Sequence, residues 1–430
     1  MEPRRLSDWL DYVSQLHTQV IEMGLDRVND VFRRLCRNAR LAKTVVTLAG
    51  TNGKGSTLAA VEALALAAGK TVGAYTSPHI LRFNERVRIN GVDVSDEALE
   101  AAFAAVETAR GQTALTYFEF TTLVGFYLFQ QARLDVVLLE VGLGGRLDAV
   151  NIVDPDLAVI TSVDLDHQEW LGDSREDIGR EKAGILRPGI PLVIAEEAPP
   201  TSVVDVAGKL GCATSIWRQD FTFERSGDAS QALQWRGRRK HTEMVIDGLS
   251  DNGLPMANMA AAIQAAMLLN FSLSEAQIVA AIAGVKVQGR FQLLRRNPEM
   301  YADVGHNPHA ARYLKQWLAG LPVKKPQVAV FSALKDKDVA GIVKELTGVF
   351  DRWFVFPLNV DRAMPLAQLA ELVQQNQPAP LQTCDSLSEC LAQATSEVGA
   401  DGRIVAFGSF FTVAEIFQNG MMGADEGDGR

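Results

Sequence analysis

The stretch TLAGTNGKGST at residues 47–57 has the residue types and the spacing of a phosphate-binding loop. Its glycines at 50, 53 and 55 allow backbone N–H groups to converge on an anion, and Lys54 supplies a positive charge. A strand-like run precedes the loop, and a helical pattern that begins near Ser56 follows it. The spacing departs from G-x-x-x-x-G-K-[ST], because Gly55 stands where a hydroxyl should follow the lysine. A glycine turn with a solvated lysine is the alternative that this stretch leaves open.

Three further polar side chains follow strand-like runs. Ser77 ends TVGAYTS, Glu140 ends DVVLLE, and His167 comes shortly after DLAVITSV. Because the carboxyl ends of parallel strands share one edge of an open sheet, where ligands bind, we expect these side chains to converge near Lys54. A hydroxyl, a carboxylate and an imidazole beside a triphosphate can form part of a Mg²⁺ shell. The ordinary alternatives are a turn before Pro78, a strand-end carboxylate and a surface histidine.

Two other motifs are less informative by themselves. Lys182, in EDIGREKAGILRPG, follows Arg180 and Glu181 in a helical pattern, where a solvated lysine is the ordinary interpretation. The run GLGGRLD does not complete G-x-G-x-x-G, because Leu147 stands where the third glycine belongs. We therefore reject NAD binding.

The elements that must position these residues alternate along the chain. Apolar strand-like runs lie at residues 44–49, 71–77, 135–142, 156–163 and 191–196. Helical patterns separate them and lie at residues 95–109, 118–133 and 173–187. This alternation predicts an α/β domain of the P-loop type, with a parallel sheet covered by helices on both faces. Polar, alternating text at 212–250 predicts a small antiparallel hairpin region, and helical stretches follow it.

The alternation of strands and helices restarts after the run VKVQGR, with MYADVG, PQVAVFSAL, RWFVFPL and RIVAFGSFF. This predicts a second, smaller, Rossmann-like α/β domain. A chain of 430 residues is in any case too long for one compact core. We place the domains at residues 1–286 and 287–420, and we expect the glycine-rich acidic tail at 421–430 to be disordered.

The composition is that of an enzyme acting on small molecules. The formal net charge of −10 argues against a nucleic-acid or membrane-surface partner. No run of 18 apolar residues is present, and the N-terminal segment reads as an amphipathic helix without an export signal. The four cysteines lack metal-ligand or disulfide spacing, which indicates a reducing, cytoplasmic environment.

The motifs GTNGKGS, TSPHxxxFNER, LEVGLGGRLDA, DHxxxLG and REKAGI, followed by GR, DVGHNP and GSFF, occur in this order. The ordered set resembles the folylpolyglutamate synthase and dihydrofolate synthase family of the Mur-ligase superfamily, over nearly the whole chain. The family's glycine-lysine loop has the spacing found here, which removes the objection raised by Gly55. One departure is Gly305 in DVGHNP, where the family usually has alanine.

The resemblance implies an ATP-dependent acid–amino-acid ligase that works through an acyl-phosphate. It would add L-glutamate to dihydropteroate, forming dihydrofolate, and to reduced folates, forming polyglutamates. ATP and Mg²⁺, with two ions, would be the cofactors, and we expect a monomer whose partners are these small molecules. A carboxylate is a poor acylating agent, so phosphorylation makes it reactive. Phosphoryl transfer needs positioning and charge neutralisation rather than a protein nucleophile.

The resemblance also implies roles for particular residues. The ATP phosphates would be held by Gly53, Lys54, Gly55 and Ser56, and Mg²⁺ by Ser77, Glu140 and His167. Lys182 would carry a carbamate, and Lys54, Lys182, His167 and Arg290 would form the catalytic set. Adenine, phosphate and ribose would be held by Asn258, Arg290 and Asp303, with His306 assisting them. The pterin substrate would contact Asp26, Arg27, Phe118, Glu119, Phe120, Thr121, Arg146, Leu147 and Asp148.

Three alternative functions are weighed against this one. The chain could be a folylpolyglutamate synthase only, without activity on dihydropteroate. A ligase acting on cell-wall amino-sugar peptides would need a nucleotide-sugar domain before the glycine-lysine loop, and only about 43 residues precede it. A P-loop ATPase switch acting on a partner would hydrolyse ATP without consuming an amino acid.

Overall fold

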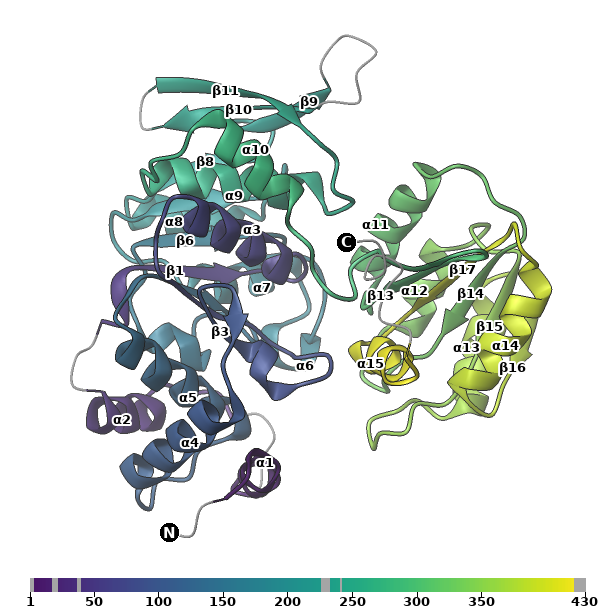
Figure 1. Ribbon diagram of the computed structural model, residues 1–430, viewed down its shortest axis with the longest axis horizontal. Helices are drawn as coiled ribbons and strands as arrows, with labels where there is room; N and C mark the ends of the chain where they lie inside the picture. Colours follow the sequence, from purple (N-terminus) through teal and green to yellow (C-terminus); the bar gives the residue numbers. More distant parts are fainter. Residues whose placement is uncertain (1–3, 18–21, 37–39, 226–232, 240–241, 421–430) are drawn as a thin grey trace, which may run out of the picture. The chain divides into compact units, whose positions relative to one another are not determined.

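The structure is a computed structural model that describes residues 4–17, 22–36, 40–225, 233–239 and 242–420. Two compact units divide the chain, Met1–Lys286 and Val287–Arg430. Each unit has its own sheet, with helices packed against it (Figure 1). The tail at 421–430, for which the sequence predicts disorder, lies outside the described residues.

The first unit is built on an eight-stranded sheet in the order β4-β3-β2-β5-β1-β6-β7-β8. Its strands are β1 (Ala42–Ala49), β2 (Val72–Tyr75), β3 (Val87–Ile89), β4 (Val92–Asp93), β5 (Leu134–Glu140), β6 (Leu157–Ile160), β7 (Pro191–Ile194) and β8 (Ala213–Ile216). The six strands β2, β5, β1, β6, β7 and β8 pair in parallel with their neighbours in this order. Strands β3 and β4 add an antiparallel edge beside β2. The continuous apolar runs of β1, β5 and β6 reflect burial of their strands on both faces.

Helices cover both faces of this sheet, as the sequence predicts. The helices are α1 (Leu6–Ser14), α2 (Asp26–Leu35), α3 (Lys54–Ala67), α4 (Asp96–Arg110), α5 (Tyr117–Ala132), α6 (Gln168–Leu171), α7 (Arg175–Ala183), α8 (Thr201–Lys209), α9 (Met256–Leu268) and α10 (Glu275–Ala283). One face packs α2, α4 and α5 against alternate strand residues such as Val45 and Val137. On the other face, α3, α9 and α10 pack together (Figure 1).

Two local features differ from the sequence prediction. The helix after the glycine-lysine loop begins at Lys54 rather than near Ser56, because Gly53 adopts a left-handed φ of 90° and serves as its N-cap. The region 212–250 does contain an antiparallel sheet, made of β9 (Thr222–Arg225), β10 (Leu233–Arg239) and β11 (Thr242–Leu249). The interpretation of the whole region as a separate hairpin was wrong for β8, which pairs in parallel with β7 and extends the large sheet.

The second unit has a six-stranded sheet in the order β12-β13-β17-β14-β15-β16. Its strands are β12 (Gln292–Arg296), β13 (Glu299–Asp303), β14 (Gln327–Phe331), β15 (Arg352–Val355), β16 (Leu381–Thr383) and β17 (Arg403–Phe407). Its helices are α11 (Pro308–Ala319), α12 (Val339–Glu345), α13 (Leu366–Asn376), α14 (Leu387–Val398) and α15 (Phe410–Gln418). All neighbouring strands pair in parallel except β12, which is antiparallel to β13. Phe331, Trp353 and Phe407 anchor its core.

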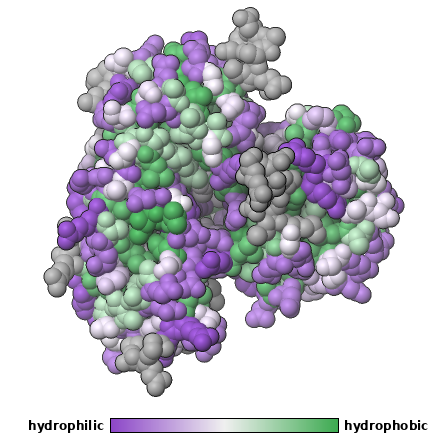
Figure 2. All heavy atoms as spheres, viewed as in Figure 1, coloured by the Kyte–Doolittle hydropathy of each residue, from purple (hydrophilic) through white to green (hydrophobic). Residues whose placement is uncertain are grey.

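The surface is mixed in character. Figure 2 shows hydrophilic side chains interspersed with hydrophobic ones on the visible face of each unit. Within the described ranges, no helix is both long enough and apolar enough to span a bilayer. The four cysteines are free thiols, three of them buried.

Candidate active site

The strand order of the first sheet brings the predicted site segments to one edge. Strands β2, β5, β1 and β6 are consecutive and parallel, so their carboxyl ends lie side by side. Ser77 follows β2, Glu140 ends β5, the glycine-lysine loop follows β1, and His167 lies beyond β6. The expectation that these strand ends share an edge is therefore confirmed, although the segments are separated by up to about a hundred residues in the chain.

The glycine-lysine loop leads directly into the positive N-terminal end of α3. The Nζ atom of Lys54 donates to the carbonyl of Gly50 at 2.9 Å, and the Thr57 hydroxyl donates to the carbonyl of Gly53 at 2.9 Å. A Cβ atom at Gly53 would lie 2.6 Å from Nδ2 of Asn258, so the close approach and the left-handed φ both require glycine. Backbone N–H groups at a helix N-terminus, together with a lysine, make a phosphate site.

Two hydroxyl residues hold this loop in place, and sequence analysis did not identify either of them. The Thr51 hydroxyl donates to the carbonyl of Asp164 at 3.0 Å and accepts from the Asp164 N–H at 3.0 Å. The Ser162 hydroxyl accepts from the Asn52 N–H at 3.0 Å. The segments after β1 and β6 are thus fastened to each other, which gives the phosphate loop a fixed position beside the segment that carries His167.

Glu140 lies between the Ser77 segment and the phosphate loop. It is 5% exposed, and its Oε2 accepts from the backbone N–H of Ser77 at 3.3 Å. The same oxygen would lie 3.8 Å from a Cβ atom at Gly55. A buried carboxylate beside a hydroxyl residue is an oxygen donor set that suits Mg²⁺, with phosphate and water oxygens completing the shell. These residues therefore fit the predicted metal.

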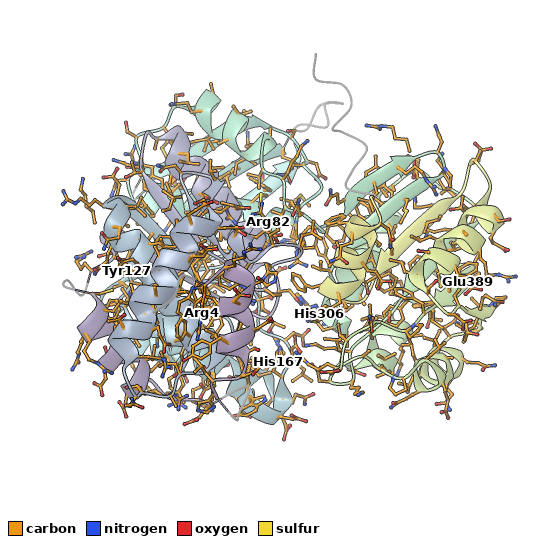
Figure 3. All side chains as sticks on the ribbon, turned by 60° about the horizontal axis from the view of Figure 1, so that its bottom comes forward. Arg4, Arg82, Tyr127, His167, His306 and Glu389 are labelled. Carbon is orange, nitrogen blue, oxygen red and sulfur yellow. The ribbon has the colours of Figure 1, made fainter. Side chains whose placement is uncertain are left out.

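His167 is the most exposed of the predicted metal ligands. It is the N-cap of α6, with a left-handed φ of 53°, and its side chain is 36% exposed (Figure 3). Its Nε2 lies 3.9 Å from Oδ1 of Asp166. Within the described residues, no group of three or more His, Cys, Asp or Glu side chains is arranged to hold a metal ion.

Lys182 is buried, so its interpretation as a solvated helix lysine was wrong. It is 3% exposed in α7, and burial together with the positive charge of Lys54 lowers its pKa to about 7, while Asp166 and Asp148 oppose that shift. Arg180 and Glu181, the sequence neighbours, are engaged elsewhere: Arg180 pairs with Asp177 at 3.1 Å and Glu181 with Arg146 at 2.9 Å. The cation that acts on Lys182 is therefore Lys54.

Asp148 closes the loop that follows β5. Its carboxylate accepts from the backbone N–H groups of Leu143 at 2.8 Å and Val150 at 3.0 Å. Burial raises the pKa of Asp148 to about 6, while these hydrogen bonds and Lys54 oppose that rise. The sequence predicts a substrate contact here, and the structure gives the side chain a loop-closing role close to Lys54. Leu147 is half-buried and Arg146 is exposed.

Two of the predicted substrate segments lie against each other. Nε of Arg27, next to Asp26 at the start of α2, donates to both carboxylate oxygens of Glu119, at 2.8 and 2.9 Å. Phe118 approaches the loop after β5, where a Cβ atom at Gly142 would lie 2.5 Å from its Cζ. This close approach requires glycine at the loop and leaves the aromatic ring against the backbone.

Two residues of the FEFT segment are packing residues, contrary to the role expected from the sequence. Phe120 is fully buried and stacks on Phe103 with ring centroids 5.6 Å apart. Thr121 is also fully buried, with its hydroxyl 3.4 Å from that of Tyr75. Successive helix residues point in different directions, so the segment cannot present all four side chains to one ligand. Phe118 is half-buried and remains the candidate for direct contact, whereas Glu119 is 4% exposed and pairs with Arg27.

Asn258 touches the phosphate loop. It lies in the first turn of α9, is 6% exposed, and donates from Nδ2 to the Ser56 hydroxyl at 3.3 Å. The sequence places this residue at the adenine. Its position against Gly53 and Ser56 puts it within reach of whatever the loop binds.

In the second unit, Asp303, Arg290 and His306 form a cluster of their own. Asp303 is buried and accepts from the N–H of Gly305 at 2.7 Å; burial raises its pKa, and Arg290 opposes that rise. The Arg290 guanidinium lies 5.3 Å above the Phe410 ring, and the His306 ring centroid is 5.9 Å from the Phe410 centroid (Figure 3 labels His306). A Cβ atom at Gly305 would lie 2.6 Å from Oδ1 of Asp303, so glycine suits this carboxylate position.

The fold and the sheet-edge site define a nucleotide-binding α/β protein of the Mur ligase class. The Mur ligase middle domain matches residues 48–266, and the Mur ligase glutamate ligase domain matches residues 289–410. The dihydrofolate synthase/folylpolyglutamate synthase of Escherichia coli (strain K12) is 40% identical over 413 residues, 96% of this chain and 95% of that protein.

Solved structures agree with these matches. E. coli FolC in complex with DHPP and ADP has a TM-score of 0.91 at 40% identity, and the match covers 97% of each chain. The bifunctional folylpolyglutamate synthase/dihydrofolate synthase of Yersinia pestis, complexed with AMPPNP and Mn ion, has a TM-score of 0.89 at 41% identity, over 97% of this chain and 98% of that one. The chain belongs to the dihydrofolate synthase/folylpolyglutamate synthase family of Mur ligases.

Proposed function

We propose that this chain is an ATP-dependent ligase that adds L-glutamate to dihydropteroate, forming dihydrofolate, and to reduced folates, forming folylpolyglutamates. The observation that carries the proposal is the arrangement at one edge of the first sheet. The phosphate loop follows β1 there, Glu140 ends the neighbouring strand β5, and the buried Lys182 of α7 is close enough to Lys54 for the two charges to interact. Its relatives include a protein bound to DHPP and ADP and one bound to AMPPNP and Mn ion. Membership of the family disfavours the P-loop switch and the cell-wall ligase.

The residues of the first unit have distinct proposed tasks. Lys54 and the N-terminal end of α3 hold the ATP phosphates, with Gly53, Gly55 and Ser56 giving the backbone its close approach. Ser77, Glu140 and His167 hold a divalent metal, which when bound supplies charge neutralisation for phosphoryl transfer. Transfer makes the substrate carboxylate an acyl-phosphate, which the glutamate amine then attacks with loss of phosphate. Charge neutralisation at this edge lets two anions, the carboxylate and the phosphate, approach each other.

The burial of Lys182 strongly affects its protonation state. Because burial lowers the pKa of Lys182 to about 7, the neutral amine is abundant at neutral pH and can react with CO₂ to form a carbamate. We propose that the carbamate is the working form. It replaces a positive charge beside Lys54 by a negative one that can accept hydrogen bonds or approach a metal ion.

The substrate and adenosine contacts complete the assignment. For the pterin substrate we propose the segment at Asp26 and Arg27, the half-buried Phe118, the buried Glu119 through its pairing with Arg27, and Arg146 with Leu147. Asn258 on the phosphate loop, and Asp303, Arg290 and His306 in the second unit, are proposed for ATP. The buried Asp303 carboxylate is suited to ribose hydroxyl groups, because it can accept their hydrogen bonds.

The decisive experiment measures ADP release by the purified protein with dihydropteroate and with a reduced folate, each with and without L-glutamate. We expect release in both cases only when glutamate is present. If ADP is released with the reduced folate plus glutamate but not with dihydropteroate plus glutamate, the function is that of a folylpolyglutamate synthase only. ADP release that does not depend on glutamate would instead support a P-loop ATPase switch. A monomer and a cytoplasmic location belong to the same proposal, and light scattering and fractionation test them.

A further inference from the structure

Arg86 is a buried arginine without an acidic partner among the described residues. It ends the short helix η1 (Phe83–Arg86) and is 8% exposed. Its Nε donates to Nδ1 of His79 at 2.8 Å, and its guanidinium lies 5.6 Å from the Phe83 ring and 5.7 Å from the Tyr117 ring. A neutral imidazole acceptor and two aromatic faces leave the positive charge uncompensated.

Other arginines show how unusual this environment is. Arg403, which is 1% exposed, pairs with Glu299 at 2.8 Å and donates to Gln327 and Pro322 as well. Arg82 and Arg88, which flank Arg86, pair with Asp96 at 3.0 Å and Glu62 at 2.6 Å. Burying a charge without a partner costs free energy, so a buried, unpaired guanidinium points to a partner that comes from outside the chain.

The adjacent carboxylate is committed to its own loop. Glu85 accepts from the backbone N–H groups of Ile80, Leu81 and Arg82 at 2.6, 2.8 and 2.7 Å. It therefore caps the turn that precedes η1 and forms no ion pair with Arg86. Neither Nη group of Arg86 donates to any residue in the described part of the chain. A bidentate donor pair thus remains for a ligand.

Arg86 contacts a segment from each half of the proposed site. Its carbonyl accepts from the N–H of Thr76 at 2.9 Å, which ties the end of η1 to the residue before Ser77. Its guanidinium lies over the ring of Tyr117, the first residue of α5, which is followed by Phe118. Arg86 thus contacts both the segment that leads to Ser77 and the start of the helix that carries Phe118.

We propose that the Arg86 guanidinium binds the carboxylate of the acceptor substrate, an aromatic pterin acid or a folate. The inference rests on the proposed function. A guanidinium matches a carboxylate bidentately, and the aromatic walls around Arg86 strengthen that pairing by excluding water. Held there, one carboxylate oxygen attacks the γ-phosphorus of ATP, a new P–O bond forms, the bond to the bridging oxygen breaks, and ADP leaves with its electron pair.

The test compares Arg86→Gln and Arg86→Lys with Arg82→Gln as the matched control, because Arg82 is exposed and bonded to Asp96 (Figure 3). Binding is measured by calorimetry without ATP, using dihydropteroate and 6-hydroxymethylpterin, which lacks the carboxylate. In Arg86→Gln, the affinity for dihydropteroate should fall by about 10- to 100-fold, whereas the affinity for 6-hydroxymethylpterin should stay within about twofold of the wild-type value. The affinity of Arg86→Lys for dihydropteroate should lie between those of the wild type and Arg86→Gln, because an ammonium keeps the charge but cannot donate two parallel hydrogen bonds. Arg82→Gln should match the wild type.

Steady-state kinetics give a second, independent measurement. In Arg86→Lys, the KM for the acceptor should rise while the KM for L-glutamate stays unchanged. An equal loss for both probes would make Arg86 a packing residue, and a rise confined to the KM for glutamate would assign it to the other carboxylate; either result overturns the proposal. If the wild type binds dihydropteroate but releases no ADP, the proposed function fails while the binding comparison still decides the role of Arg86. Should Arg86→Gln not fold, Arg86→Lys carries both measurements.

Discussion

Replacing Lys182 by methionine tests the most specific chemical expectation of the site. Methionine keeps much of the volume of a buried lysine but cannot form a carbamate. The pKa of about 7 makes about three quarters of the amine neutral at pH 7.5, against about one part in a thousand at the ordinary value of 10.5. The buried site thus raises the concentration of reactive amine by roughly 700-fold.

The same pKa shift fixes a stability dependence. The folded-state pKa is lower than the unfolded one, so between about pH 7 and 10.5 the unfolded chain binds more protons, and stability rises with pH across that window. As pH falls from 10.5 to 7 this contribution is lost, and below about pH 7 the amine is charged in both states, so the dependence ends. The largest change is on the order of 5 kcal/mol for an unmodified amine. Lys182→Met should remove the dependence, so its stability relative to the wild type should fall as pH rises.

Three measurements follow from this chemistry. After labelling with ¹³C-bicarbonate, the wild type should show a carbamate carbon by NMR that is absent from Lys182→Met. Activity of the variant should fall by about 10- to 100-fold, the usual cost of losing a group that supports a metal site, and should recover in part with a short added carboxylic acid. Arg180→Met on the same helix is the control, because the Arg180 side chain is 61% exposed and pairs with Asp177.

A wild type without the carbamate signal at pH 8 in bicarbonate, together with full activity of Lys182→Met, would exclude a working carbamate at Lys182. A carbamate signal that persists in Lys182→Met would place the modification elsewhere. If the wild type and Lys182→Met show the same stability profile from pH 6 to 9, the lowered pKa is wrong.

Three further substitutions test other parts of the proposed sites. Glu140→Gln should weaken Mn²⁺ binding, measured by electron paramagnetic resonance with nucleotide present, by more than about tenfold, and unchanged affinity would exclude Glu140 from the metal. Arg290→Ala should lower turnover at saturating ATP about tenfold or more without shifting the thermal unfolding of the protein, and unchanged turnover would contradict its role. Gly305→Ala should destabilise the protein by about 1–3 kcal/mol in thermal denaturation, because the new Cβ would lie 2.6 Å from Oδ1 of Asp303; an unaltered melting temperature would show that the carboxylate moves freely.

Most of the fold follows from the sequence because buried parallel strands are long apolar runs. Runs such as 44–49 and 135–142 leave no other interpretation once amphipathic helices separate them. The strands that the sequence did not predict include short edge or near-edge strands such as Val87–Ile89, Val92–Asp93, Ala213–Ile216, Gln292–Arg296 and Leu381–Thr383. Few of their residues are buried, so they lack the continuous apolar signal, and their pairing depends on the neighbour that the rest of the sheet offers.

For the candidate site, the sequence predicted which residues gather at the sheet edge but not which side chains they contact. The rule that parallel strands end together was enough to group Ser77, Glu140 and the glycine-lysine loop. This rule could not predict which side chains contact each other across the site. Arg180 and Lys182 are only two residues apart. Residues with this spacing on a helix point roughly in opposite directions, so Arg180 is exposed and pairs with Asp177, whereas Lys182 is buried and close to Lys54.

Arg86 shows the same limit from the opposite direction. Its sequence neighbour Glu85 has the opposite charge and would be the natural partner in any local interpretation, but three backbone N–H groups take that carboxylate. The charge left on Arg86 is therefore a property of the folded turn rather than of the FNER motif. Side-chain identity at a strand end can be taken from sequence, whereas protonation state and unpaired charge depend on groups that other elements bring in. Those two quantities decide what the site can bind, and they are what the substitutions at Lys182 and Arg86 measure.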